Sequence, residues 1–148
     1  MQSLVFVIVE QIWQQFTTFK FERDLFTAPD KGTLGVDWYV TKDHPEGRPS
    51  KNDTRPILLL VPGMSGLNNM MCIDDIAKAG LKSGYRVGVV LHRCTNNIPI
   101  TSYQLSCSYS WEDISSMFDF VYQTYVIDSN TKQKKCKFYA FGVSLGAV

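Results

Sequence analysis

The sequence predicts an α/β fold in which an antiparallel hairpin precedes parallel core strands that helices cover. Two observations carry this prediction. Three short runs, at 57–61, 86–91 and 138–143, are largely apolar, as central parallel strands are, and segments with helical spacing of apolar residues separate them. With 148 residues, of which 45% are apolar and 20% charged, the chain is long enough for one globular domain.

The first twenty residues show aromatic and aliphatic side chains close to helical spacing, from Val5 to Phe19. We expect a helix packed on the domain, although the same pattern also fits an amphipathic helix in a membrane interface, with peripheral membrane association. The apolar run 4–9 is too short to span a bilayer, which needs ~20 apolar residues. The domain prediction is therefore an N-terminal helix over 1–20 and a partial α/β domain over 21–148.

The next segments predict the opening hairpin and the first core strand. Runs at 21–26 and 34–40 have strand composition, and the turn 27–32 joins them. A polar loop rich in proline and aspartate follows, up to residue 56. The strand at 57–61 then ends abruptly at Pro62-Gly63-Met64-Ser65-Gly66.

Two helices separate the three core strands. Apolar residues recur at helical spacing over 70–82, and Ser83-Gly84 ends this helix. After a polar loop over 92–110, a second helix begins near Trp111, with Ser110 as its N-cap. Four aspartates are expected on helix surfaces or at helix starts: Asp74, Asp75, Asp113 and Asp119.

Composition excludes several classes of partner. The formal net charge is +1, which gives no reason to expect a nucleic-acid partner, and the lysine-rich stretch 132–137 is interpreted as a solvated surface loop. The four cysteines are widely spaced without a C-x-x-C pair, and only two histidines are present, so no metal or cofactor is predicted. Free, buried thiols are expected, as in an intracellular, reducing compartment.

The most specific motif is Gly142-Val143-Ser144-Leu145-Gly146, which directly follows the last predicted strand. A G-x-S-x-G turn between a strand and a helix projects the serine hydroxyl clear of the sheet and is typical of serine hydrolases. Ser144 is therefore the candidate nucleophile. A chance glycine-rich turn is the alternative.

A second motif supplies the other half of an acyl-transfer site. Serine attack on an ester creates an oxyanion, which needs a backbone N–H from the residue after the serine and one from a loop after an earlier strand. Leu145 and Met64 are the candidates, and the glycines at 63 and 66 would let substrate approach the backbone. The alternative is that Pro62-Gly63 only ends a strand.

Several ordered blocks together carry a family resemblance. The chain from about Phe21 onward resembles the α/β-hydrolase lipases of the embryogenesis-associated and medium-chain phospholipase branch, apparently as an N-terminal fragment that stops just after the nucleophile turn. The blocks that carry the resemblance are 26–32, 36–39, 55–66, 84–87, 92–93, 98–102, 111–114 and 142–146.

The resemblance implies a carboxylic ester hydrolase acting on lipid acyl esters, such as monoacylglycerols or phospholipids, with some relatives transferring the acyl group to an alcohol. It implies Ser144 as nucleophile and the Met64 and Leu145 amides as oxyanion donors. The acid and histidine of the triad follow the serine in this fold, so they have no matching position here. Relatives commonly carry a membrane segment upstream.

The chain departs from the family pattern in the loop after His92, and one alternative function stays open. Cys94-Thr95-Asn96-Asn97 stands where the family usually has glycines, and asparagine tolerates the left-handed backbone angles that such a turn needs, whereas cysteine does so less readily. His92 precedes the serine and is expected to cap a loop. The alternative function is a noncatalytic binding or regulatory remnant, which could self-associate through an open sheet edge.

Overall fold

The computed structural model describes residues 19–43, 45–50, 52–63, 70–105 and 111–147. Nearly all of the helix expected over 1–20 lies outside these residues, so that expectation stays a prediction. In the described ranges, no helix is both long and apolar enough to cross a membrane.

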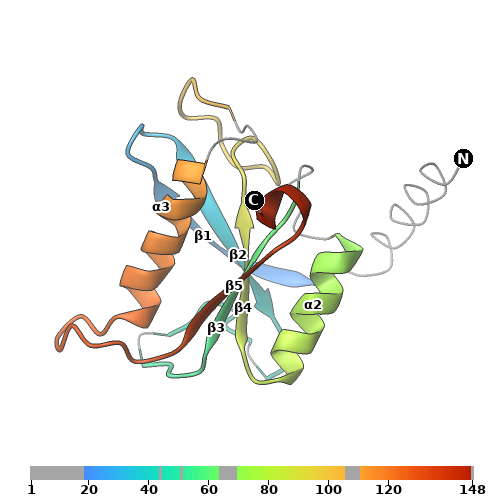
Figure 1. The fold of residues 1–148 in the computed structure, drawn as a ribbon, viewed down its shortest axis with the longest axis vertical. Helices are drawn as coiled ribbons and strands as arrows, with labels where there is room; N and C mark the ends of the chain where they lie inside the picture. Colours follow the sequence, from blue (N-terminus) through green and yellow to red (C-terminus); the bar gives the residue numbers. More distant parts are fainter. Residues whose placement is uncertain (1–18, 44, 51, 64–69, 106–110, 148) are drawn as a thin grey trace, which may run out of the picture.

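The described strands form one mixed sheet in the order β1-β2-β4-β3-β5. Strands β1 (Lys20–Thr27) and β2 (Thr33–Val40) make the predicted antiparallel hairpin. Strand β2 pairs antiparallel with β4 (Arg86–Leu91), whereas β3 (Ile57–Val61) pairs in parallel with both β4 and β5 (Phe138–Gly142). The carboxyl ends of the three parallel strands therefore meet at one end of the sheet (Figure 1).

Two helices cover opposite faces of this sheet (Figure 1). Helix α2 (Met71–Lys82) packs Ile73 and Ala77 against residues of β3 and β4, and helix α3 (Trp111–Val121) packs Met117 and Val121 against the other face. The chain thus forms three layers around two apolar clusters. The predicted α/β fold class is confirmed, and element boundaries differ from the sequence-based ones by one or two residues.

The end of α3 differs from a regular helix. A π-helical turn, Tyr122–Val126, directly continues it. Tyr125 points from this turn into the core, where its hydroxyl donates to Asp24 and its ring meets the Trp38 ring edge-on at 5.4 Å between centroids. The indole of Trp38 also donates to Asp24 at 2.9 Å. Tertiary contacts with a buried carboxylate accompany this departure from α-helical geometry.

Two of the four aspartates expected on helix surfaces or at helix starts confirm the second alternative, although both are buried. Asp74 and Asp113 do stand in the first turns of α2 and α3, but they are 0% and 4% exposed. The Tyr39 hydroxyl donates to Asp74 at 2.9 Å, and Arg93 donates to Asp113. A carboxylate can face the core when a donor from another element satisfies it.

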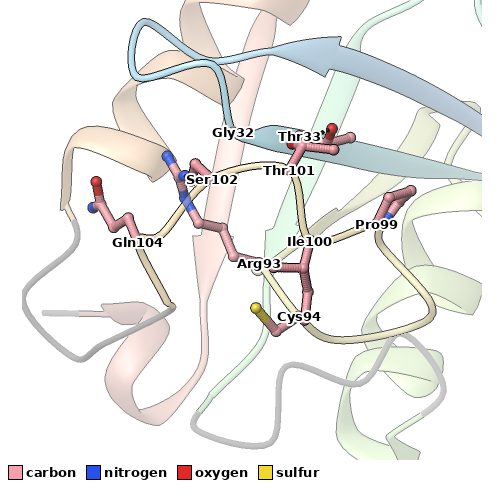
Figure 2. A pocket seen from close by; sticks show the side chains of 9 residues that line it. All are labelled: Gly32, Thr33, Arg93, Cys94, Pro99, Ile100, Thr101, Ser102 and Gln104. Atoms are coloured by element: carbon pink, nitrogen blue, oxygen red, sulfur yellow. Dashed lines mark hydrogen bonds between the residues drawn. The ribbon is translucent and has the colours of Figure 1, made fainter.

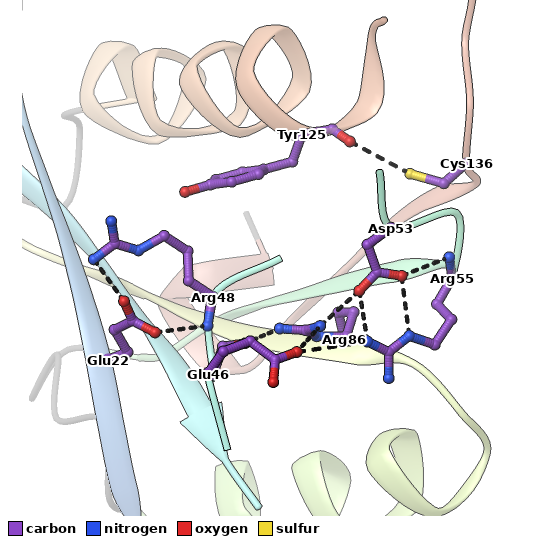
Figure 3. A network of polar contacts seen from close by, with 9 residues as sticks. Glu22, Glu46, Arg48, Asp53, Arg55, Arg86, Tyr125 and Cys136 are labelled. Carbon is purple, nitrogen blue, oxygen red and sulfur yellow. Dashed lines mark hydrogen bonds and ion pairs between the residues drawn. The ribbon is translucent and has the colours of Figure 1, made fainter. Parts of the chain in front are cut away.

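The polar loop between β2 and β3 is tied to the sheet by charged groups (Figure 3). Arg86, the first residue of β4, is 2% exposed, and its Nη1 lies 2.6 Å from Asp53 and 3.0 Å from Glu46. Arg55 donates to the same Asp53 carboxylate at 2.6 Å. These bonds hold a segment without regular secondary structure in one place.

Candidate active site

The candidate site lies where β5 passes into the short 3₁₀ helix η2 (Ser144–Ala147). The Val143 N–H donates to the Val61 carbonyl at 3.0 Å, and the Gly146 N–H donates back to the Val143 carbonyl at 2.9 Å. The first bond holds the turn against the carboxyl end of β3, and the second closes the turn itself. The serine is thereby fixed at the end of the sheet where the parallel strands finish.

Ser144 has a left-handed backbone, with φ of 54°. This region costs a residue with a Cβ atom about 1 kcal/mol or more, so it persists only where the surrounding structure imposes it. The side chain is exposed. Strain at an exposed serine between a strand and a helix is the geometry of a nucleophile turn.

The two flanking glycines are required by space. A Cβ added to Gly142 would lie 2.0 Å from the Gly146 carbonyl oxygen, and one added to Gly146 would lie 2.3 Å from the Val61 carbonyl oxygen. Both contacts are with backbone, which has little freedom to move away. The G-x-S-x-G spacing therefore follows from the close packing of this turn on β3.

The turn after β3 reaches the serine. Gly63 is buried, and a Cβ added to it would lie 3.1 Å from the Ser144 Cβ. Met64, the first candidate oxyanion donor, lies outside the described residues. Leu145, the second, is 38% exposed. Its role and that of Ser144 stay predictions, which the geometry supports.

His92 lies at the end of β4 and contacts the turn after β3. Its Nε2 is 3.3 Å from the Pro62 carbonyl oxygen, as suits a residue that holds a loop. Among the described residues, no histidine or carboxylate is hydrogen-bonded to the Ser144 hydroxyl. The same ranges hold no cluster of three metal-ligating side chains.

The turn after His92 is built from three left-handed residues. Cys94, Asn96 and Asn97 have φ values of 60°, 48° and 60°. Sequence reasoning anticipated this for the asparagines, and the structure places the cysteine in the same region. Cys94 and Cys72 are exposed, which corrects the expectation of buried thiols, whereas Cys136 is buried as expected. Arg23 donates to the Asn96 carbonyl at 2.6 Å, which ties the turn to β1.

Sequence reasoning missed an ionic cluster centred on Arg93, which is 4% exposed. The guanidinium donates to both oxygens of Asp113 at 2.6 Å, to Asp30 at 2.6 and 2.9 Å, and to the Ser102 hydroxyl at 2.8 Å. Hydrogen bonds from Arg93 hold the pKa of Asp30 well below its usual range. A Cβ at Gly32 would lie 1.9 Å from Arg93 Nη1, so a side chain there would displace the guanidinium from its partners.

This ionic cluster joins the hairpin turn, the loop after β4 and the start of α3. Figure 2 shows two of its members, Arg93 and Ser102, beside Gly32 of the hairpin turn. One signal in the sequence could have found it: Asp30, Arg93, Ser102 and Asp113 fall in four of the blocks that carry the family resemblance. Sequence blocks that are far apart in the chain can belong to one cluster when their residues meet in the fold.

Comparisons with known proteins agree with this geometry. No protein-family model matches the chain. The chain is 23% identical over 129 residues to phospholipase ABHD3 of Bos taurus, a match covering 87% of this chain and 29% of that protein. The chain therefore spans less than a third of this relative's length.

Solved structures show the same fold. The esterase Pf2001 of Pyrococcus furiosus superimposes with a TM-score of 0.59 at 16% identity, over 87% of this chain and 44% of the esterase. An alpha-beta serine hydrolase homologue from Coxiella burnetii gives 0.59 at 16% identity, over 88% of this chain and 55% of its own. Part of the α/β-hydrolase fold is thus present, as the resemblance implied.

Proposed function

We propose, from the premise that this chain belongs to the α/β-hydrolase superfamily, that it carries the nucleophile of a carboxylic ester hydrolase acting on lipid acyl esters. The observation that carries the proposal is the turn at Ser144. A left-handed, exposed serine stands between two glycines whose places no other residue can fill without displacing backbone. Such a turn costs stability, and a nucleophile that must project from a sheet gives it a purpose.

In the proposed reaction, the Ser144 hydroxyl oxygen attacks the ester carbonyl carbon and loses its proton to a general base. The Leu145 and Met64 N–H groups stabilise the oxyanion, and the tetrahedral intermediate collapses with loss of the alcohol. Water or a second alcohol then releases the acyl group. The base and its carboxylate partner follow the serine in this fold, so we assign them to no described residue.

Lipid acyl esters are the proposed substrates, with phospholipid or monoacylglycerol as the class. The support is the match to a protein named phospholipase and the esterases among the structural neighbours. The name esterase denotes an enzyme that cleaves esters, and the name phospholipase denotes one that cleaves phospholipids.

A second candidate function, a noncatalytic binding module, has its own observation. Strand β5 has one neighbour in the described sheet, and Tyr139 and Phe141 on it are 43% and 48% exposed. An unpaired strand edge with apolar side chains can pair with another chain. In this second candidate function, two copies of the chain bind each other through the edge of β5.

A fluorophosphonate probe separates the two candidates, because it phosphonylates a serine whose turn stabilises the developing oxyanion faster than an ordinary surface serine, even where the general base is missing. We expect slow labelling of the wild-type chain, with none in Ser144→Ala. Ser83→Ala is the matched control, since Ser83 is exposed at the far end of α2, and it should label like the wild type. Labelling that persists in Ser144→Ala, or a wild type that stays unlabelled, would contradict the catalytic proposal.

A further inference from the structure

The segment after β4 exposes large apolar side chains to solvent. Ile100 and Trp111 are 69% exposed, Leu105 is 62% exposed, and Tyr103 is completely exposed. We call these four residues the apolar rim. They are half of the eight large hydrophobic residues found exposed in the described ranges. A concentration of this kind marks an interaction surface more often than chance exposure does.

The segment that carries the rim contains no charge, and the exposed Glu112 follows it directly. Residues 94–111 include no aspartate, glutamate, lysine, arginine or histidine, in a chain whose residues are 20% charged. Water-facing loops ordinarily carry charged groups, which are costly to remove from water. A segment of apolar, hydroxyl and amide side chains can leave bulk water at a much lower cost.

The base of the rim is held firmly, so its exposed side chains are not needed for local packing. The Arg93 cluster holds Ser102, and the Thr101 hydroxyl lies 2.8 Å from that of Thr33. Ile98 inserts into the protein and is 4% exposed, whereas Ile100, two residues later, stands in solvent. The loop thus presents its apolar groups outward from a fixed base.

The rim lies at the end of the sheet that carries the candidate nucleophile. It follows the carboxyl end of β4, which is parallel to β3 and hence to β5. Figure 1 shows residues 92–105 extending beyond the same end of the sheet as the η2 turn. His92, at the root of the segment, contacts Pro62 beside the serine turn.

We propose that the apolar rim docks this protein onto the surface of a phospholipid bilayer. Tyrosine and tryptophan favour the boundary between headgroups and acyl chains, and isoleucine and leucine gain by entering the acyl region. The absence of charge fits a zwitterionic surface, which offers no net charge to pair. The proposal deepens the proposed function, because it states that the lipid substrate is met as part of a bilayer. It rests on the proposed function only for the reason why the protein would dock there.

A different surface would suit an anionic membrane. Lys134, Lys135 and Lys137 line an open groove with Tyr85 and Tyr139, beside the amino end of β5. Since the parallel strands run away from this end, it lies opposite the candidate nucleophile. Binding through the lysines would depend on anionic lipid and would weaken with salt. Binding through the rim would depend on neither.

Flotation with phosphatidylcholine vesicles tests the proposal. The variant carries Ile100→Ser, Tyr103→Ser and Leu105→Ser, and we expect its partitioning to fall at least about tenfold, because apolar area no longer enters the acyl region. The matched control carries Leu25→Ser, Tyr139→Ser and Phe141→Ser, which remove three exposed apolar side chains elsewhere. It should partition within about twofold of the wild type. Circular dichroism checks that both variants keep their fold.

Fluorescence locates the contact independently of the variants. In a Trp13→Phe chain the remaining tryptophans are the buried Trp38 and the exposed Trp111. We expect Trp111 emission to shift to shorter wavelength with vesicles, and brominated phosphatidylcholine to quench it. Binding should be the same in 0.05 M and 1 M sodium chloride.

Four results would overturn the proposal: no vesicle binding, an equal loss in the control, binding that requires anionic lipid, or a rim that instead joins two copies of the chain by size exclusion. Vesicle binding needs no turnover. A chain that binds through the rim but whose Ser144 never reacts would therefore contradict the proposed function alone. A reactive Ser144 without vesicle binding would contradict the docking alone.

Discussion

Gly146 lies so close to Val61 that a side chain on the glycine would collide with the valine's carbonyl oxygen, at 2.3 Å from the added Cβ. The contact joins the helical turn after β5 to the end of β3. It makes the second glycine of the serine motif a packing requirement, and it fixes where the serine stands relative to the neighbouring strand.

Gly146→Ala should therefore destabilise the fold or displace the turn. We expect a loss of about 2 kcal/mol or more in the free energy of unfolding, since the collision is with backbone. Urea denaturation measures it. The control is Gly84→Ala, where φ is 83° and no atom lies within 4 Å of an added Cβ. There only the left-handed backbone opposes alanine, at about 1 kcal/mol. Equal losses at both positions would contradict the steric account.

Arg93→Leu should be more damaging than loss of a surface charge. It leaves the buried carboxylate of Asp113 without the guanidinium that pairs with it, and removing one partner of a buried pair costs about 3–5 kcal/mol. Lys78→Ala is the control, because its pair with Asp75 is exposed and such pairs contribute about 0–1 kcal/mol. A difference below about 1 kcal/mol between the two variants would show that the Arg93 cluster does not hold the three elements together.

Stability should fall in acid. Hydrogen bonds from Arg93 lower the pKa of Asp30. Burial raises the pKa of Asp53, but the hydrogen bonds from Arg55 and the charges of Arg55 and Arg86 together lower it by more. An unfolded aspartate titrates near pH ~3.9, so the unfolded chain takes up protons first as the pH falls. The stabilisation is present above pH ~4 and is lost below it. Urea midpoints at pH 6, 4 and 3 measure this, and Asp53→Asn should show a shallower decline than the wild type.

Local chemistry made much of the fold predictable. The strand at 57–61 is apolar and ends at Pro62-Gly63, and the hairpin turn carries Asp30 and Gly32, so periodicity and turn residues agreed with the final structure. The serine motif was predictable for the same reason, because its glycines are required by contacts close to the turn.

Long-range pairing was not predictable in this way. Asp113 looks like an ordinary acidic residue of a first helical turn, and only the fold brings Arg93 to it from 20 residues away. Asp24 likewise meets Tyr125 across 101 residues. The π-helical turn at 122–126 depends on such contacts and has no signature in the spacing of apolar residues. Three of the four rim residues were interpreted only as part of a polar loop, and Trp111 as the start of a helix, because exposure is a property of the folded chain.

The most direct test of Ser144 as nucleophile locates the acyl group after reaction with an activated medium-chain ester, such as 4-nitrophenyl octanoate. Release of the acyl group also needs a base, so acid quenching followed by peptide mass mapping should capture the intermediate. The account predicts one octanoyl group on the peptide that contains Ser144, and none in Ser144→Ala. An acyl group on another residue, or no acylation, would contradict it.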